Sequence, residues 1–373
     1  MKVGLNATCL NDRPSGARQR FIGIYSELFK RLSDTEFVIY EPADCRISRW
    51  FEATPNLSYR RTPIPSKGHG RKLVEGFWYW HRSLCAERFD IFEGFALPLV
   101  KAPTGQTILT VHDIRGRYLG WRSLHHVPYK AILQKSLRNA DHVIAVSEAM
   151  RNEIHCFYPY VPITVIHNGL NIGDFDRISD IDLVRVRQKF EIPEEFVLTV
   201  GHIEKRKNYL LLVDAIAKLR DQGSPHSLLI VGNDSGWKKA IEERVASKNL
   251  SNSVRILENM TDLEVRSVYK LASLFVFPSS YEGFGIPILE AMAASCPTVL
   301  SDIPVFREIT ENKGNYFRHC DVDAMACAID HVLKSYGERR RLVEYGAGRV
   351  KAFSHQSAAT QLSRLYRSLV KPY

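Results

Sequence analysis

Short runs of β-branched and aromatic residues alternate with longer amphipathic stretches along almost the whole chain. Short apolar runs favour buried strands, whereas apolar residues at intervals of three and four favour helices. Alternation of the two is typical of parallel α/β sheets. The pattern predicts strands at 2–8, 36–40, 107–111, 142–146, 163–166, 196–200, 227–231, 254–257, 273–277 and 298–300. It predicts helices near 17–32, 71–87, 127–139, 148–157, 208–220, 236–247, 261–272, 287–294, 322–335 and 339–350.

A polar stretch interrupts this alternation near the middle of the chain, where acidic residues follow Asn168-Gly169. Since compact domains of this class contain on the order of 150–200 residues, the interruption indicates two domains. We expect an N-terminal, doubly wound Rossmann-like domain at 1–170 and a second at 171–354, facing each other across a cleft. A last helix at about 355–373 is expected to pack back on the first domain.

The composition and charge of the chain indicate a class of protein and a candidate partner. Apolar residues make up 45% of the chain and charged residues 25%, the balance of a soluble globular protein. The net charge is +10, and most of it lies in residues 1–170, which hold 23 Lys and Arg against 15 Asp and Glu. Such a surface attracts an anionic partner, for example a membrane surface, a phosphorylated lipid or nucleic acid. It can equally serve only to keep the protein in solution.

Cysteine usage and hydropathy indicate a compartment. The seven cysteines are scattered and never spaced C-x-x-C, which argues against a disulfide framework or zinc ribbon and favours a reducing cytoplasm. The apolar run at the N-terminus is too short for a signal peptide, and no run of 18 apolar residues is present. The basic, aromatic stretch 71–82 suggests peripheral attachment at the inner face of the cell membrane. The alternative, which we favour for this stretch, is a core helix.

The strongest chemical signal is the segment 279–290, SSYEGFGIPILE, which follows one predicted strand and leads into a helix. Gly283 and Gly285 allow the backbone to approach a ligand closely, and the start of a helix attracts an anion. Glu282 and Glu290 can accept hydrogen bonds from sugar hydroxyls. We favour a binding site here over a plain turn with two solvated glutamates.

A second signal, GHIEKRKN at 201–208, also lies between a strand and a helix. Arg206 and Lys207 can clamp a diphosphate, and the arginine can bind it with two parallel hydrogen bonds. Asn208 is expected to cap the following helix. The alternative is a solvated basic turn, but the position after the first strand of the second domain favours the clamp.

These two segments resemble the motifs of the retaining glycosyltransferases of family 4, which have the GT-B fold. Glu282 and Glu290 match the family's E-x7-E motif, and Arg206-Lys207-Asn208 matches its Arg-Lys-Asn or Arg-Lys-Gly segment. Further matches lie at 15–18, 111–113, 145–148 and 165–169, so the resemblance covers nearly the whole chain and is weakest over the first hundred residues or so. It departs at His202, where many members have arginine.

The resemblance implies roles for individual residues. Arg206 and Lys207 would hold the donor diphosphate, Glu290 the ribose and Glu282 the donor sugar. The implied catalytic residues are His112, Glu282 and Asp113. The implied donor-binding residues are Gly16, Arg206, Lys207, Gly283, Phe284, Gly285, Ile286 and Glu290. A structural role remains the alternative for the His112-Asp113 pair and for Gly16, and helix capping is favoured for Ser147-Glu148.

No motif indicates a metal or a resident cofactor. Asp180-Ile181-Asp182 and Asp321-Val322-Asp323 have the Asp-x-Asp pattern, but neither ends a clear apolar strand, and we interpret both as loop or helix-start residues. The sequence has no G-x-G-x-x-G, Walker loop, H-E-x-x-H or G-x-S-x-G motif, and the basic charge has no nucleic-acid motif behind it. We therefore expect metal-independent chemistry with a nucleotide sugar as co-substrate and no nucleic-acid partner.

The resemblance thus implies a retaining hexosyltransferase that uses a nucleotide-diphosphate sugar, with GDP-mannose or a related GDP-sugar favoured. Its acceptor would be a glycan or a polyprenyl-linked molecule in surface polysaccharide or lipopolysaccharide assembly. One alternative is a non-catalytic sugar-nucleotide-binding protein on the same scaffold. A sugar-nucleotide epimerase is another alternative, against which the two motifs together argue.

Overall fold

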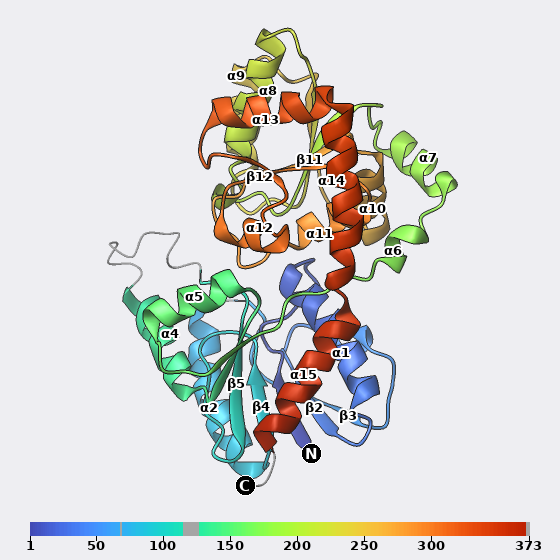
Figure 1. The fold of residues 1–373 in the computed structure, drawn as a ribbon. Helices are drawn as coiled ribbons and strands as arrows, with labels where there is room; N and C mark the ends of the chain where they lie inside the picture. Colours follow the sequence, from blue (N-terminus) through green and yellow to red (C-terminus); the bar gives the residue numbers. More distant parts are fainter. Residues whose placement is uncertain (68, 115–126, 371–373) are drawn as a thin grey trace. The chain divides into compact units, whose positions relative to one another are not determined.

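The computed structural model describes residues 1–67, 69–114 and 127–370, and the chain in it forms two compact units (Figure 1). The first unit comprises Met1–Gly169 and Ser354–Tyr373. The second unit comprises Leu170–Phe353. Each contains one parallel sheet with interleaved helices, which confirms the predicted α/β class.

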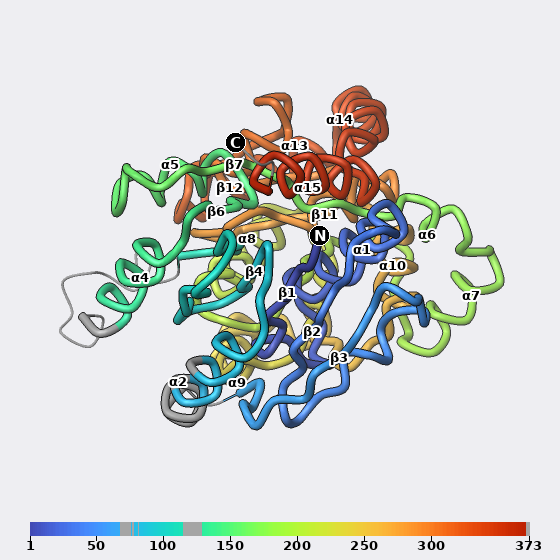
Figure 2. The backbone as a smooth tube through the Cα atoms, turned by 90° about the horizontal axis from the view of Figure 1, so that it is seen from below, coloured from blue at the N-terminus to red at the C-terminus, as the bar shows by residue number. Residues whose placement is uncertain are grey.

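Among the described residues of the first unit, seven parallel strands pair in the order β3-β2-β1-β4-β5-β6-β7 (Figure 2). The strands are β1 (Lys2–Asn6), β2 (Glu36–Glu41), β3 (Leu57–Arg61), β4 (Ile91–Gly94), β5 (Gln106–Val111), β6 (His142–Ala145) and β7 (Ile163–Val165). The helices are α1 (Gly16–Arg31), η1 (Ile47–Trp50), α2 (His69–Ala86), α4 (Val127–Asn139), α5 (Glu148–Phe157) and α15 (His355–Val370). The strand order reverses between β1 and β4, the type of position where open α/β sheets bind ligands.

Two strands of this sheet were not among the predicted elements. β3 is a partly exposed edge strand that ends in two arginines, so its apolar alternation is weak. β4 is a short, fully buried strand that contains a glutamate, Glu93, where the pattern of a central strand calls for an apolar residue.

Glu93 is tolerated there because hydroxyl groups surround it. Tyr25 on α1 donates a hydrogen bond to Glu93 Oε1 at 2.7 Å, and Thr110 on β5 and Tyr366 on α15 also donate to its carboxylate. Tyr366 thereby ties the C-terminal helix to the sheet, and α15 packs along α1. Burial raises the pKa of Glu93, and the hydroxyl donors only partly offset that effect.

The aromatic stretch in α2 has both a buried and an exposed face. Trp80 is buried against Tyr40 and Phe92, as the core interpretation requires. Trp78 is 67% exposed. Among the described residues, none of the helices combines the length and the apolar character that a membrane span requires.

The second unit, which is described throughout, has six parallel strands in the order β10-β9-β8-β11-β12-β13. They are β8 (Phe196–Val200), β9 (Ser227–Val231), β10 (Val254–Leu257), β11 (Leu274–Phe277), β12 (Thr298–Ser301) and β13 (Asn315–Phe317). The helices are α6 (Gly173–Asp176), α7 (Asp180–Lys189), η3 (Lys205–Lys207), α8 (Tyr209–Asp221), α9 (Lys238–Ser247), α10 (Asp262–Leu271), α11 (Ile286–Ala293), α12 (Pro304–Ile309), α13 (Val322–Lys334), α14 (Tyr336–Arg349) and η4 (Val350–Ala352).

Both Asp-x-Asp strings lie at helix starts, as interpreted from the sequence. Ser179 and Asp182 form a capping box at the start of α7. Asp321 caps α13 by accepting a hydrogen bond from the Ala324 amide at 2.9 Å. Their carboxylates therefore stabilise helix ends. α6, α7, α12 and β13 are short and were not predicted.

Candidate functional site

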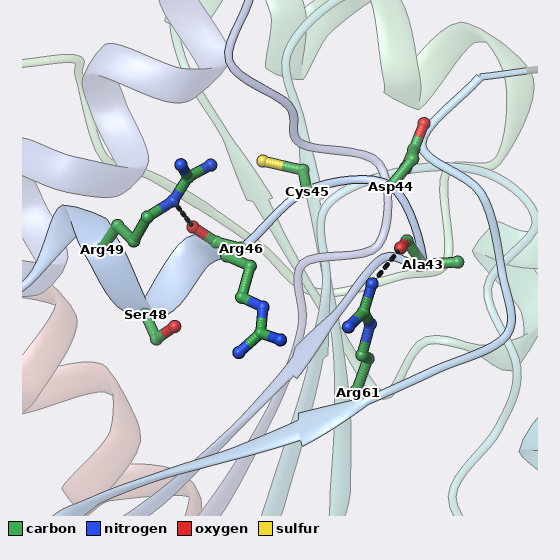
Figure 3. Close-up of a pocket in the computed structure, with 7 residues that line it drawn as sticks. All are labelled: Ala43, Asp44, Cys45, Arg46, Ser48, Arg49 and Arg61. Atoms are coloured by element: carbon green, nitrogen blue, oxygen red, sulfur yellow. Dashed lines mark hydrogen bonds between the residues drawn. The ribbon is translucent and has the colours of Figure 1, made fainter.

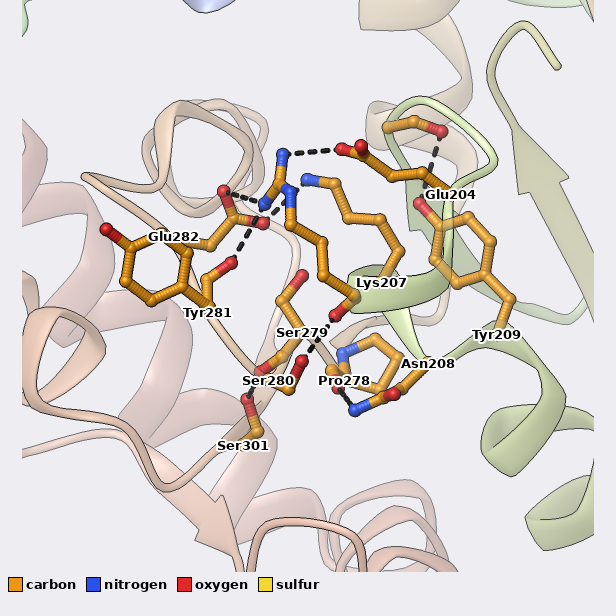
Figure 4. A network of polar contacts seen from close by, with 12 residues as sticks. Glu204, Lys207, Asn208, Tyr209, Pro278, Ser279, Ser280, Tyr281, Glu282 and Ser301 are labelled. Carbon is orange, nitrogen blue, oxygen red and sulfur yellow. Dashed lines mark hydrogen bonds and ion pairs between the residues drawn. The ribbon is translucent and has the colours of Figure 1, made fainter. Parts of the chain in front are cut away.

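The candidate donor site lies where the strand order of the second sheet reverses. β8 and β11 are neighbours there, and the two motif loops follow directly after them. Hydrogen bonds fix the loops to each other: the Ser280 amide donates to Arg206 O at 2.8 Å, and Asn208 Nδ2 donates to Pro278 O at 3.1 Å. Two motifs separated by some 75 residues in the sequence thus form one site (Figure 4).

A cluster of paired charges occupies the centre of this site (Figure 4). Arg206 Nη1 lies 2.6 Å from Glu282 Oε2, and Lys207 Nζ lies 2.7 Å from Glu282 Oε1. Arg206 also lies 2.6 Å from Glu204 and donates to Tyr281 O at 2.8 Å. Arg206 is therefore held between two carboxylates, and Glu282 bridges both cations of the predicted clamp.

The electrostatics of this cluster follow from burial and charge. Burial alone would raise the pKa of Glu282, but the charges of Lys207 and Arg206 outweigh it and lower that pKa to about 2. Burial lowers the pKa of Lys207, while Glu282 acts in the opposite direction. The Lys207 ammonium also lies 4.7 Å from the centre of the Phe277 ring, where a cation is favoured. Glu282 is thus a carboxylate at any physiological pH.

The glycine segment connects β11 to α11. Gly285 has φ of 150°, and a Cβ atom there would lie 3.1 Å from Ile309 Cδ1, so a larger residue would be strained and crowded. Phe284 and Ile286 are buried as whole residues and anchor this segment in the core of the second unit. Pro287 lies in the first turn of α11, as predicted.

Glu290, the second glutamate of the motif, lies within α11 and is 9% exposed. The hydroxyl of Tyr269 on α10 donates to Glu290 Oε2 at 3.1 Å. That hydrogen bond orients the carboxylate, and the sequence pattern gave no indication of it.

The predicted capping role of Asn208 is wrong. Its backbone has the left-handed conformation, with φ of 53°, and its side chain makes no capping hydrogen bond to α8. The side chain instead reaches the Pro278 carbonyl on the other loop. Asn208 therefore joins the two loops of the site. This contact could not be inferred from a residue pattern at a single helix end.

The predicted residues of the first unit form a separate group at the carboxyl edge of the first sheet. Gly16 is the first residue of α1, and Ser15 caps this helix by accepting a hydrogen bond from the Arg18 amide at 3.2 Å. His112 and Asp113 follow β5 directly. Ser147 caps α5 by accepting from the Met150 amide at 3.0 Å, as expected.

His112 lies in an environment that keeps it neutral. Burial, and after it the charge of Arg20, lower the pKa of His112 to about 3. Arg20 is a buried arginine of α1 that donates to Ile166 O at 2.8 Å and to Asn168 Oδ1 at 2.9 Å. No motif indicated a role for Arg20, although a lone arginine on the otherwise apolar and aromatic face of α1 was a usable signal.

Within the ranges that the structure describes, no three His, Cys, Asp or Glu side chains are arranged to hold a metal ion.

Comparisons with known proteins agree with the motifs. Residues 39–174 match the family model described as Glycosyltransferase Family 4, and residues 181–349 match the model described as Glycosyl transferases group 1. The O-antigen chain mannosyltransferase RfbU of Salmonella typhimurium is 29% identical over 238 residues, which are 63% of this chain and 62% of that protein. The match therefore spans about three fifths of this relative.

Two solved structures have the same architecture. Sucrose-phosphate synthase from Thermosynechococcus elongatus has a TM-score of 0.77 at 23% identity, with 99% of this chain and 98% of that chain covered. HepE from Anabaena, solved with UDP and glucose, has a TM-score of 0.76 at 17% identity, with 99% and 100% covered. At these identities the likeness concerns the fold.

Proposed function

Because the chain belongs to the family 4 glycosyltransferases and has their GT-B fold, we propose that it transfers a hexose from a nucleotide-diphosphate sugar to a glycan or polyprenyl-linked acceptor. The observation that carries the proposal is the cation pair of Arg206 and Lys207 beside the glycine segment, where the strand order reverses. The similarity to a mannosyltransferase of O-antigen chains supports a step in surface polysaccharide or lipopolysaccharide assembly.

In this proposal the second unit stabilises the leaving group. Arg206 and Lys207 neutralise charge on the departing diphosphate, helped by the positive end of the α11 helix dipole. Glu290 accepts hydrogen bonds from the ribose, and Glu282 with the backbone of 283–286 holds the donor sugar. Since two cations meet the diphosphate directly, the reaction is proposed to need no divalent metal.

The proposed stereochemical course is retention. His112, from the first unit, supports positive charge that develops on the sugar, and a neutral imidazole does so without repelling that charge. Asp113 is the proposed orienting partner of His112. The acceptor hydroxyl attacks on the face from which the diphosphate leaves, and a phosphate oxygen takes its proton, so no separate base is required.

GDP-mannose or a related GDP-sugar is the proposed donor, because the relative RfbU carries the name of a mannosyltransferase. A cytoplasmic protein with peripheral attachment to the inner face of the membrane fits that role. The basic excess in residues 1–170 and the exposed Trp78 support attachment.

A thermal-shift panel of GDP-, UDP-, ADP- and dTDP-sugars tests the donor. A ligand present at 100 times its Kd should stabilise the protein by about 2.7 kcal/mol, and the GDP-sugars should give the largest shift. The best donor is then incubated with membrane extract in excess EDTA, and the product is examined by proton NMR. An α-linked donor should yield an α-linked product.

Each part of the proposal can fail separately. A β-linked product would overturn retention, and activity that EDTA abolishes and manganese restores would overturn metal independence. A nucleotide shift without transfer to any acceptor would identify a sugar-nucleotide-binding protein instead. If UDP-sugars gave the largest shift, the GDP assignment would be wrong and the transfer reaction would stand.

A further inference from the structure

A pocket of about 520 Å³ opens beside the ends of β2 and β3 in the first unit (Figure 3). Its size is that of a small-molecule site. Neither the motifs nor the proposed donor chemistry uses it. It is lined by Ala43, Asp44, Cys45, Arg46, Ser48, Arg49 and Arg61.

Positive charge dominates the pocket, since three arginines line it against a single carboxylate. That carboxylate, Asp44, already accepts hydrogen bonds from the Ser66 amide at 2.7 Å and from the Ser66 hydroxyl at 2.9 Å. Asp44 is therefore turned to the Ser66 loop and neutralises the arginines only in part. An anion is the ligand that such a lining favours.

The three arginines differ in how firmly they are held. Arg61 donates to the Ala43 carbonyl at 2.8 Å, which fixes its guanidinium in the wall of the pocket (Figure 3). Arg49 lies 3.4 Å from Asp12, but both side chains are more than half exposed, so this ion pair is weak. Among the described residues, no hydrogen bond or ion pair engages the guanidinium of Arg46. Arg46 is thus available to a ligand.

The pocket is connected to the loop that leads to Gly16. Asp12 in that loop contacts Arg49 and accepts a hydrogen bond from Trp50 Nε1 at 3.3 Å. The guanidinium of Arg18 lies 5.0 Å from the centre of the Trp50 ring. A molecule anchored in the pocket would therefore extend along the carboxyl edge of the first sheet, toward the point where its strand order reverses.

We infer that this pocket binds a phosphate group of the acceptor, through Arg46, Arg49 and Arg61. The identification of the ligand as the acceptor rests on the proposed function, whereas the phosphate site itself consists of residues of the first unit alone. A phosphate can form two parallel, charge-assisted hydrogen bonds with a guanidinium, whereas a neutral sugar brings no negative charge to balance the arginines. The acceptor is thus a phosphorylated molecule, either a lipid phosphate or a free sugar phosphate.

Binding of two phosphate probes tests the inference. Glycerol 3-phosphate is titrated by calorimetry with the second unit saturated by the best nucleotide diphosphate. Phosphatidylcholine vesicles with and without phosphatidic acid are used for sedimentation. The variant Arg46→Ala is compared with Arg138→Ala, which removes the same charge from an exposed position on α4 in the same unit. Arg46→Ala should weaken binding of at least one probe roughly tenfold or more, and Arg138→Ala should leave it unchanged.

The two probes identify the source of the phosphate. Arg46-dependent binding of phosphatidic acid vesicles assigns the pocket to a lipid phosphate, and Arg46-dependent binding of glycerol 3-phosphate alone assigns it to a free phosphate. If Arg46→Ala and Arg138→Ala bind both probes equally, the inference is wrong. The nucleotide thermal shift should be the same in both variants. If the wild type transferred no sugar but showed Arg46-dependent phosphate binding, the proposed function would be wrong and the phosphate site would stand.

Discussion

In both sheets the strand order reverses once, between β1 and β4 in the first unit and between β8 and β11 in the second. The buried charges near the two reversals are satisfied in different ways. In the second unit Glu282 lies against Arg206 and Lys207, so opposite charges pair directly. In the first unit Arg20 donates to carbonyl and amide oxygens, while Glu93 accepts from hydroxyl groups.

The pKa values record this difference. Pairing lowers the pKa of Glu282 to about 2 against the effect of its burial, whereas the pKa of Glu93 is raised because burial outweighs the effects of its hydroxyl donors and of the Arg20 charge. Under the proposed function, a diphosphate would compete with the Glu282 carboxylate for Arg206 and Lys207. The first unit instead presents a neutral His112. At the strand-order reversals, the second unit thus places a bound carboxylate between two cations, and the first unit places an uncharged imidazole.

Removal of the shared carboxylate should have the largest effect. In Glu282→Gln the buried Lys207 loses its counter-ion, and breaking a buried pair in this way costs about 3–5 kcal/mol, or a fall in Tm on the order of 10 °C. Thermal unfolding measures it. The control is Glu344→Gln, which breaks an exposed pair with Arg340 in the same unit and should cost less than about 1 kcal/mol. Equal losses in the two variants would show that burial adds nothing to this ion pair.

Lys207→Met should weaken binding of the nucleotide diphosphate by about 1.5–3 kcal/mol, because one charge-assisted contact is lost. Isothermal calorimetry with the nucleotide from the thermal-shift panel measures it. Glu282→Gln provides an internal contrast, since it removes the carboxylate that competes with the diphosphate and should bind the nucleotide at least as tightly as the wild type. An unchanged Kd for Lys207→Met would exclude Lys207 from the diphosphate site.

The sequence alone predicted most of the sheet of the second unit and both of its motif loops. β8 and β9 are buried almost throughout, so they appear as continuous apolar runs, and their predicted bounds at 196–200 and 227–231 match the structure. The bounds of the partly exposed edge strand β10, at 254–257, also match. The missed strands, β3, β4 and β13, each carry polar residues that interrupt the apolar pattern.

Pairing of side chains was not predictable from the sequence. Lys207 and Glu282 were each singled out by local motifs, but their ion pair depends on two loops that meet only through the sheet. The hydrogen bond from Tyr269 to Glu290 and the effect of the Arg20 charge on His112 were also not predictable, because in each case the partner lies on another element. The residue types near a strand end indicate which ligands a site can bind. Which side chains pair with each other depends on the order of the strands in the sheet.

Arg20→Met should give a smaller effect, because the gain from not burying a charge offsets part of the lost hydrogen bonding. We expect a loss of about 1–3 kcal/mol in unfolding free energy. The variant should also raise the pKa of His112 toward its ordinary value, since Arg20 is the second cause of its depression. NMR titration of the imidazole measures this. Arg31→Met, at an exposed position of the same helix, should change neither quantity. A His112 pKa that stays the same in Arg20→Met would show that burial alone sets it.

The smallest expected effect is a pH dependence of the unfolding free energy, which should differ between His112 in the first unit and Glu282 in the second. The folded-state pKa of His112, about 3, lies below its unfolded value near 6.5, so the unfolded chain binds more protons between these values, and stability falls as the pH drops below 6.5. Between pH 7.5 and 5.5 the loss is about 1 kcal/mol, and His112→Gln should lack it. The difference in unfolding free energy between wild type and His112→Gln should therefore shift by that amount across this window.

The stability contribution of Glu282, measured over the same pH range, should depend on pH differently from that of His112. Its stabilising contribution is fully present above the unfolded pKa near 4.5 and is lost as the pH falls toward the folded value of about 2. The stability difference between wild type and Glu282→Gln should therefore stay nearly constant from pH 7.5 to 5.5 and shrink only below about 4.5. A constant His112 difference would show that His112 has an ordinary pKa in the folded protein, and a Glu282 difference that fell between pH 7.5 and 5.5 would show that its pKa is not lowered.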